Sequence, residues 1–198
     1  MPISAEHLLL VVQDYWRSDR EFDGKLERSP ELERFQALWK QKLEKIDEWW
    51  VLHDELRAAL PHLKIGDATA TVDACFRCLV YAEQQLVSED PEDEPRSRCW
   101  AVVGCVSILA PVYTVYGVQY DYKGREWIDR RVFFEPLPPE MRAPAEVVAR
   151  KLEALFGVEA LAREIAETRI PLIVERQEPP HTTLFHALFT SAPESVPL

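Results

Sequence analysis

Four cysteines are the residues of this sequence with the most obvious capacity for chemistry. Cys75 and Cys78 form a C-x-x-C pair, and with Cys99 and Cys105 they reach the ligand count of a structural zinc site. The first pair, however, lies in a segment that alternates like a strand, where residues three apart point to opposite faces. The two residues between them also lack the turn character of a zinc knuckle. We therefore interpret the cysteines as buried, reduced thiols, and we predict neither a metal site nor a cofactor.

The histidines give weaker indications of a catalytic or metal site than the cysteines do. None of the 5 forms the helical pair with an intervening glutamate that zinc hydrolases use. His53 lies on an apolar helical stripe, as a histidine at the edge of a core does. His181 and His186 flank the last apolar segment, and either one meeting a cysteine across the fold would make a nucleophile and base pair. The 6 glycines form no phosphate loop and no dinucleotide fingerprint, which argues against a nucleotide-dependent enzyme. Because no complete catalytic constellation is visible, we predict no catalytic residue and favour a non-catalytic protein over an enzyme.

Charged residues gather around one predicted hairpin. Three carboxylates there suit acid and base chemistry or cation binding, and three arginines beside Trp127 resemble a small nucleic-acid site. Hairpin ends are commonly charged to keep a protein soluble, and edge-strand arginines discourage aggregation. We interpret all six as solvated edge residues: Asp121, Glu126, Asp129, Arg125, Arg130 and Arg131.

An acidic segment and several aromatic residues indicate recognition of another protein. The segment 88–96 holds five carboxylates and two prolines, which predicts an exposed loop that attracts a basic partner. Trp49 and Trp50 are about 100° apart on a predicted helix, so one of them is expected at the edge of the buried stripe. Tyr120 and Tyr122 share one face of a predicted strand. We predict these partner-binding residues: Glu89, Asp90, Glu92, Asp93, Glu94, Trp49, Tyr120 and Tyr122.

The elements that must position these residues follow from the periodicity of the chain. Ser4 begins a first helix that continues to Trp16. Ser29 and Pro30 begin a long amphipathic helix that ends before Pro61, either continuous or broken near Trp49. The prolines after residue 135 stop the sheet. A later helix opens at Pro144 and closes at Gly157, a short helix carries Ile165, and residues 183–189 form a short helix or an edge strand.

Between the helices lies a predicted sheet. Residues 68–82 alternate in hydrophobicity, which predicts a strand with one wet face. Three further strands, rich in Val, Tyr and Trp, are predicted at 99–109, 112–122 and 127–135. Gly104 and Gly117 lie inside two of them and indicate a bulge or a close backbone approach.

Helices, then hairpin-linked strands, then helices describe an α+β fold. We predict an antiparallel meander of four to five strands, on which N-terminal helices (one of them long) and C-terminal helices pack. We expect the helices to cover one face, with a helical hairpin beside the sheet as the alternative. The expected organisation is a single domain over 1–198, with a helical part at 4–60, the sheet at 68–135, C-terminal helices at 144–168 and a tail at 190–198.

The overall charge restricts the partners. Lys and Arg total 23 against 34 Asp and Glu, which gives a net charge of −11 at pH 7. Such a charge repels phosphate backbones and anionic lipid surfaces, so we expect neither nucleic acid nor a membrane as partner. We find no basic leader and no uninterrupted apolar stretch of about 20 residues, and so predict a cytoplasmic protein.

These features together favour a non-catalytic protein-binding protein. The leading hypothesis is an acidic immunity-type or inhibitor protein that neutralises a basic toxin or effector, or a small chaperone for one. The alternative is a small-molecule-binding protein or an enzyme with a site on the tyrosine-bearing face of the sheet, built from Tyr120, Tyr122, a cysteine and His181 or His186. A third option is a homodimer joined through the long helix.

Overall fold

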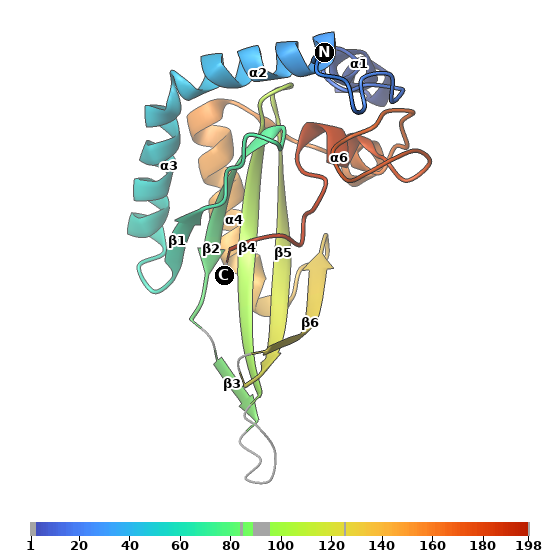
Figure 1. Cartoon of the computed structure of the whole chain (residues 1–198). Coiled ribbons are helices and arrows are strands. Elements are labelled where there is room, and N and C mark those ends of the chain that lie inside the picture. Colours follow the sequence, from blue (N-terminus) through green and yellow to red (C-terminus); the bar gives the residue numbers. More distant parts are fainter. Residues whose placement is uncertain (1–2, 84, 89–95, 125, 198) are drawn as a thin grey trace.

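A computed structural model describes residues 3–83, 85–88, 96–124 and 126–197 of the chain. Within these residues the fold is a mostly antiparallel sheet with helices packed against it (Figure 1), which confirms the predicted α+β class. None of the helices in this part of the chain is long and apolar enough to cross a bilayer.

The sheet is built around five strands that lie side by side in the order β1-β2-β4-β5-β6. Their bounds are Lys64–Asp67, Cys75–Tyr81, Arg96–Ser107, Val112–Lys123 and Glu126–Phe133. β3 (Gln85–Ser88) pairs with β4, and β7 (Glu159–Ala160) pairs in parallel with β5. The structure confirms the last three predicted strands as β4, β5 and β6, and the parallel β7 makes the sheet mixed.

The prediction for residues 68–82 was wrong in two respects. The strand begins only at Cys75, after a bend, and β1 precedes it. The face predicted to be wet is buried, since Arg77 is 5% exposed. A guanidinium nitrogen of Arg77 lies 3.3 Å from a carboxylate oxygen of Asp73, so the charge on this face is paired inside the protein. Alternation alone did not show that a second layer of chain covers these residues.

The N-terminal helices begin where the capping residues predict. Ser4 caps α1 (Ala5–Val12), and Ser29 caps α2 (Pro30–Leu43) by accepting a hydrogen bond from the Leu32 amide at 3.2 Å. The predicted long helix is broken, because α3 (Ile46–Ala59) starts in a new direction (Figure 1). The buried residues of α2 pack in one hydrophobic cluster and those of α3 in another.

These two clusters lie on opposite faces of the sheet. α3 and α4 (Pro139–Phe156) pack on one face, which we call the α4 face. α1 and α6 (Leu184–Leu188) pack on the other, which we call the α6 face. α5 (Arg163–Ala166) lies before the C-terminal segment that leads to α6. The expectation that helices cover one face was therefore wrong, because the C-terminal segment returns across the second.

α4 approaches the sheet closely because two strand residues lack side chains. A Cβ atom added to Gly104 would lie 2.6 Å from a Val148 methyl, and one added to Gly117 would overlap the sulfur of Met141. The structure thus confirms the predicted close approach at both glycines. Gly157, in the left-handed conformation with a φ of 61°, ends α4 as expected.

Candidate functional site

A groove of about 590 Å³ opens at the edge of β5, between α4 on one side and α5 and α6 on the other. It forms where the sheet is incomplete. β6 pairs with β5 only from Gly117 onward, and β7 pairs with β5 only at Val112 and Tyr113. After Phe133 the chain leaves the sheet through a proline-rich segment that leads into α4. The space beside Thr114 to Tyr116 is therefore not filled by a strand among the described residues.

The wall on the α4 face is made by one helical surface. Arg142, Ala145, Glu146 and Ala149 recur at spacings of three and four residues, next to the stripe that α4 buries against the sheet. The two alanines are too short to fill the space between the helix and β5. Arg142 donates through Nε to the Leu137 carbonyl at 2.8 Å, which fixes the chain that leaves β6.

The opposite wall is aromatic. The rings of Phe134 and Phe185 meet edge to face with their centroids 5.2 Å apart. His186 lies beside them on α6, and its Nδ1 accepts a hydrogen bond from the Thr183 amide at 3.0 Å. Burial lowers the pKa of His186 below 6.5, so this histidine is neutral at pH 7 and adds no charge to the groove.

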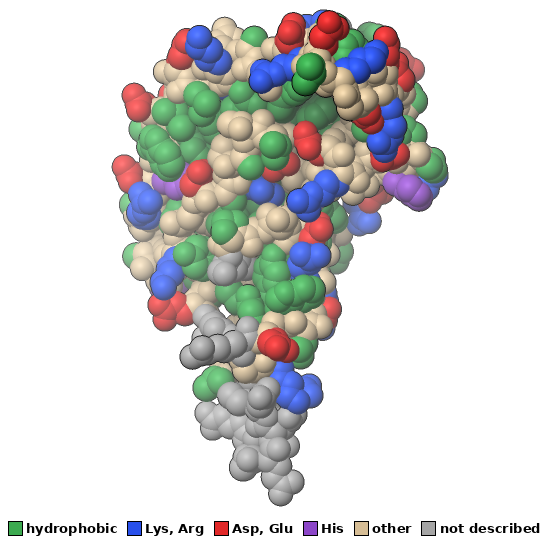
Figure 2. Space-filling model, viewed as in Figure 1, with side chains coloured by type: hydrophobic (Ala, Val, Ile, Leu, Met, Phe, Trp, Pro, Cys, Tyr) green, Lys and Arg blue, Asp and Glu red, His purple; other side chains and the backbone are tan. Residues whose placement is uncertain are grey.

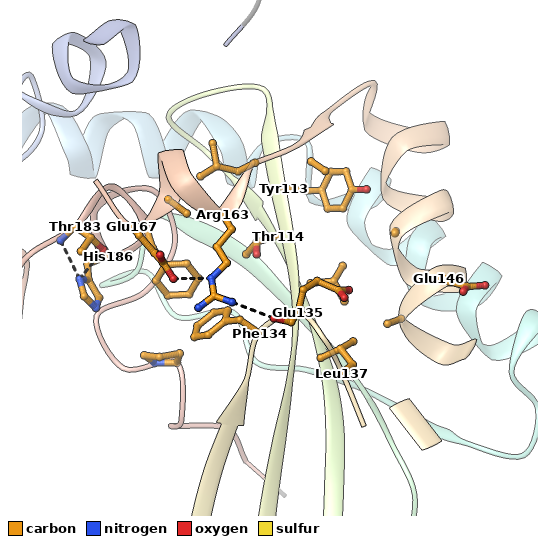
Figure 3. Close-up of a pocket in the computed structure, with 18 of the residues that line it drawn as sticks. Tyr113, Thr114, Phe134, Glu135, Leu137, Glu146, Arg163, Glu167, Thr183 and His186 are labelled. Carbon is orange, nitrogen blue, oxygen red and sulfur yellow. Dashed lines mark hydrogen bonds and ion pairs between the residues drawn. The ribbon is translucent and has the colours of Figure 1, made fainter. Parts of the chain in front are cut away.

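The charged groups of the groove differ in how many partners they have. Arg163 donates through Nε to Glu167 at 2.7 Å and through a terminal nitrogen to the Glu135 carbonyl at 3.1 Å. Figure 3 shows this guanidinium between the two glutamates and close to Phe134. The side-chain carboxylates of Glu135 and Glu146 form no hydrogen bond or ion pair with any described residue. Neither carboxylate is therefore neutralised by a described neighbour, but Figure 3 shows the Glu146 side chain directed away from Thr114 and Phe134, so Glu135 is the unpaired carboxylate inside the groove.

Tyr113 forms the end of the groove next to β7, and its hydroxyl is already engaged. It donates to Glu153 at 2.6 Å. Burial, and then this bond, raises the pKa of Tyr113 above its ordinary value, so the phenol stays protonated. Tyr113 contributes an aromatic surface to the groove rather than a base.

Of the predicted partner-binding residues, Trp49, Tyr120 and Tyr122 lie in the described part of the chain. Glu89, Asp90, Glu92, Asp93 and Glu94 lie outside the described residues. Trp49, which was predicted as a partner-binding residue, does not lie on the surface. It is 2% exposed, and its indole nitrogen donates to Asp67 at 2.9 Å. Its neighbour Trp50 is 43% exposed and is the member of the pair that lies at the edge of the stripe.

The tyrosine-bearing face is the α6 face, and part of it is covered. Tyr116 is buried against Phe185. Tyr120 and Tyr122 are half-buried, with ring centroids 6.4 Å apart, and neither lines the groove. The Tyr120 hydroxyl donates to the backbone carbonyl of Glu194, so the C-terminal segment lies against this ring.

The cysteines are reduced and buried. Cys75 and Cys105 share the α6 face, whereas Cys78 lies on the α4 face. Burial raises the pKa of Cys75, Cys78 and Cys99, that of Cys78 to about 12. Thiolates are therefore disfavoured at these three positions near neutral pH. No group of three or more His, Cys, Asp and Glu in the described chain is placed to hold a metal ion.

Several charged residues around the last hairpin form ion pairs. Asp121 accepts two hydrogen bonds from Arg98, at 2.6 and 3.1 Å. Asp129 accepts one from Arg131 at 2.6 Å, which lowers the pKa of Asp129. Arg130 stacks over Trp127 at 5.6 Å. Arg125 is outside the described residues.

Sequence reasoning missed most of the groove. Of its lining, the sequence alone indicates only His186 as a candidate site residue. A signal was present in α4, where two alanines and two charged residues recur beside the buried stripe. That signal does not distinguish a groove from a solvated helix face, because the gap it borders arises from strand pairing between distant segments.

Comparison of the chain with protein families, with curated proteins and with solved structures found no match. The groove and the charge of the chain are therefore the features from which a function can be inferred.

Proposed function

We propose that this chain is a non-catalytic binding protein that holds a short basic segment of a partner protein in the groove at the edge of β5. The observation that carries the proposal is the combination of an apolar interior with the unpaired carboxylate of Glu135. A lysine or arginine side chain matches that combination, since its stem is apolar and its end is a cation.

The size of the groove supports this proposal. About 590 Å³ falls within the range of 300 to 1,000 Å³ that is typical of ligand sites. The walls are alanines and aromatic rings, while the polar groups lie at few positions. Such a site takes up a side chain or a short segment rather than a flat protein surface.

The charge of the whole chain supports a basic partner. The net charge of −11 accelerates encounter with a positively charged protein and disfavours acidic competitors. Within this class we propose an inhibitor or immunity-type protein that neutralises a basic toxin or effector. Masking a short basic segment of such a partner is sufficient for this role and requires no chemistry from the groove.

The test is selection of phage-displayed random heptapeptides on the immobilised protein, run in parallel on two variants. Ala149→Trp fills the groove from α4. Ala154→Trp places the same side chain at an exposed position of α4 that does not line the groove, and serves as the matched control. We expect wild type and Ala154→Trp to enrich the same lysine- or arginine-containing sequences, and Ala149→Trp to enrich none of them.

Calorimetry on the selected synthetic peptides then measures affinity. Glu135→Gln should weaken binding by about two- to tenfold, because it removes a charge that faces the ligand, whereas Glu146→Gln, whose carboxylate is directed away from the groove, should have a smaller effect. Peptides retained equally by wild type and Ala149→Trp, or peptides without a basic residue, would show that the proposal is wrong.

A further inference from the structure

The gap in the sheet shows how a segment would be held. Along β5, the outer edge is paired with β7 up to Tyr113 and with β6 from Gly117. Between them, Thr114 to Tyr116 have a strand partner on the β4 side alone within the described structure. At about 3.3 Å per residue, this open stretch measures about 10 Å, the length of three extended residues.

The direction of the backbone groups in the gap follows from a hydrogen bond made by the neighbouring residue Tyr113. The amide of Leu161 donates to the Tyr113 carbonyl at 2.9 Å, so that carbonyl points outward from β5 toward β7. Backbone N–H and C=O groups alternate in direction along a strand, and those of residues two apart point the same way. The amide and the carbonyl of Val115 therefore point outward into the groove.

The two walls suit the alternation of a strand. A guest strand beside Val115 would direct successive side chains to opposite faces of the sheet. One direction leads to the α4 face, where Ala145 and Ala149 leave room and Glu135 provides a charge. The other leads to the aromatic wall of Phe134 and Phe185.

We infer that the groove binds its ligand by strand addition: an extended basic segment lies between β7 and β6 and exchanges main-chain hydrogen bonds with Val115. The inference rests on the proposed function and specifies its mode of recognition. The main chain of the guest supplies affinity without regard to sequence, and the basic side chain directed to the α4 face supplies selectivity.

The test modifies the ligand and leaves the fold of the protein untouched. A peptide selected as above is resynthesised with a single N-methyl group at each position in turn. In either strand direction one peptide N–H donates to the Val115 carbonyl, whereas the N–H groups of its two neighbours point away from β5. We expect methylation at one position to weaken binding about tenfold or more, and methylation at both adjacent positions to have little effect.

A second measurement detects the new hydrogen bonds on the protein itself. Exchange of the Val115 amide with deuterium, resolved by NMR, should slow when the peptide binds, whereas the Thr114 amide, which points toward β4, should not change. A selected peptide that tolerates methylation at every position and leaves Val115 exchange unaltered would overturn strand addition while leaving the proposed function intact. Failure to select any groove-dependent peptide would overturn the proposed function itself.

Discussion

Arg163 carries a positive charge across a groove whose unpaired carboxylate is that of Glu135. Its ion pair with Glu167 is exposed on both sides, at 58% and 61%, and exposed pairs contribute little stability. Its bond to the Glu135 carbonyl joins α5 to the chain beyond β6, where a guest strand would pass. Arg163 therefore competes with the proposed ligand rather than assisting it.

Removal of the Arg163 side chain is expected to strengthen ligand binding, whereas removal of a groove residue usually weakens it. We expect Arg163→Ala to strengthen binding of a basic peptide by about two- to tenfold, because a repulsive charge and an obstructing side chain are lost. Calorimetry measures the effect. Arg57→Ala is the control, since Arg57 is similarly exposed and pairs with Asp54 on α3. Weaker binding by Arg163→Ala alone would indicate an acidic occupant and contradict the proposed charge of the ligand.

His53 makes stability depend on pH. It is 1% exposed between Trp49 and Trp50, with Nε2 3.9 Å from Asp67, and burial lowers its pKa below 6.5. As the pH falls below 6.5 the unfolded chain therefore takes up a proton more readily than the folded chain, and the free energy of unfolding decreases. We expect urea unfolding of His53→Leu between pH 7.5 and 5.5 to show a shallower pH dependence than the wild type. Parallel pH profiles would contradict this role.

Among single residues, the sequence predicted conformation better than exposure. The caps Ser4 and Ser29 act through their own backbone neighbourhood, so their role is readable from a few residues. Trp49 and Trp50 show why exposure is harder to predict from the sequence. Their angular separation implied that one is exposed, but which one depends on where β1 and the Asp67 carboxylate lie, and those contacts are not local.

At the scale of elements, the break between α2 and α3 was foreseen only as an alternative. No proline or glycine marks it. The two helices separate because their apolar faces pack into different clusters, one on each face of the sheet. The strands β4 to β6 were predictable because alternation and turn residues agree there. β1, β7 and the gap beside β5 were not, because they depend on pairing between distant segments.

The contact between α4 and the sheet supplies the prediction at this scale. Gly104→Ala should lower the free energy of unfolding by about 1 to 3 kcal/mol, because the new methyl would overlap Val148 and press against the Cys78 sulfur. Gly66→Ala is the control within the same sheet, since its methyl would make only ordinary contacts, the nearest at 3.5 Å. Urea denaturation measures both. Equal effects would show that the loss at Gly104 does not arise from close packing.

At the scale of the whole molecule, charge is spread rather than concentrated over the face that Figure 2 shows. Figure 2 shows acidic and basic side chains interspersed over the helical end of the α6 face, while apolar side chains reach the surface over the strands below. The excess of acidic groups therefore acts as a long-range field, and the groove provides the local contacts. The sequence composition predicted the excess of negative charge, but it did not predict the groove.

The acidic segment 88–96 allows a test of whether long-range charge attraction speeds up association. Reversing the charges of Glu92, Asp93 and Glu94 should slow association with a basic peptide at low salt, while unfolding free energy changes by no more than about 0.5 kcal/mol. Stopped-flow fluorescence gives the association rate. Rates that match the wild type at low salt would remove this segment from the recognition mechanism.

The position of the open stretch of β5 also bears on how the protein behaves when concentrated. Unpaired strand edges are templates for indiscriminate aggregation. Here the unpaired stretch is three residues long and recessed between helices, so a broad sheet from another chain cannot approach it. The outer strand β6 is the longer edge, and Asp129, Arg130 and Arg131 place charges along it. The same recess that admits a narrow guest thereby limits growth of mixed sheets, which favours solubility during synthesis and storage.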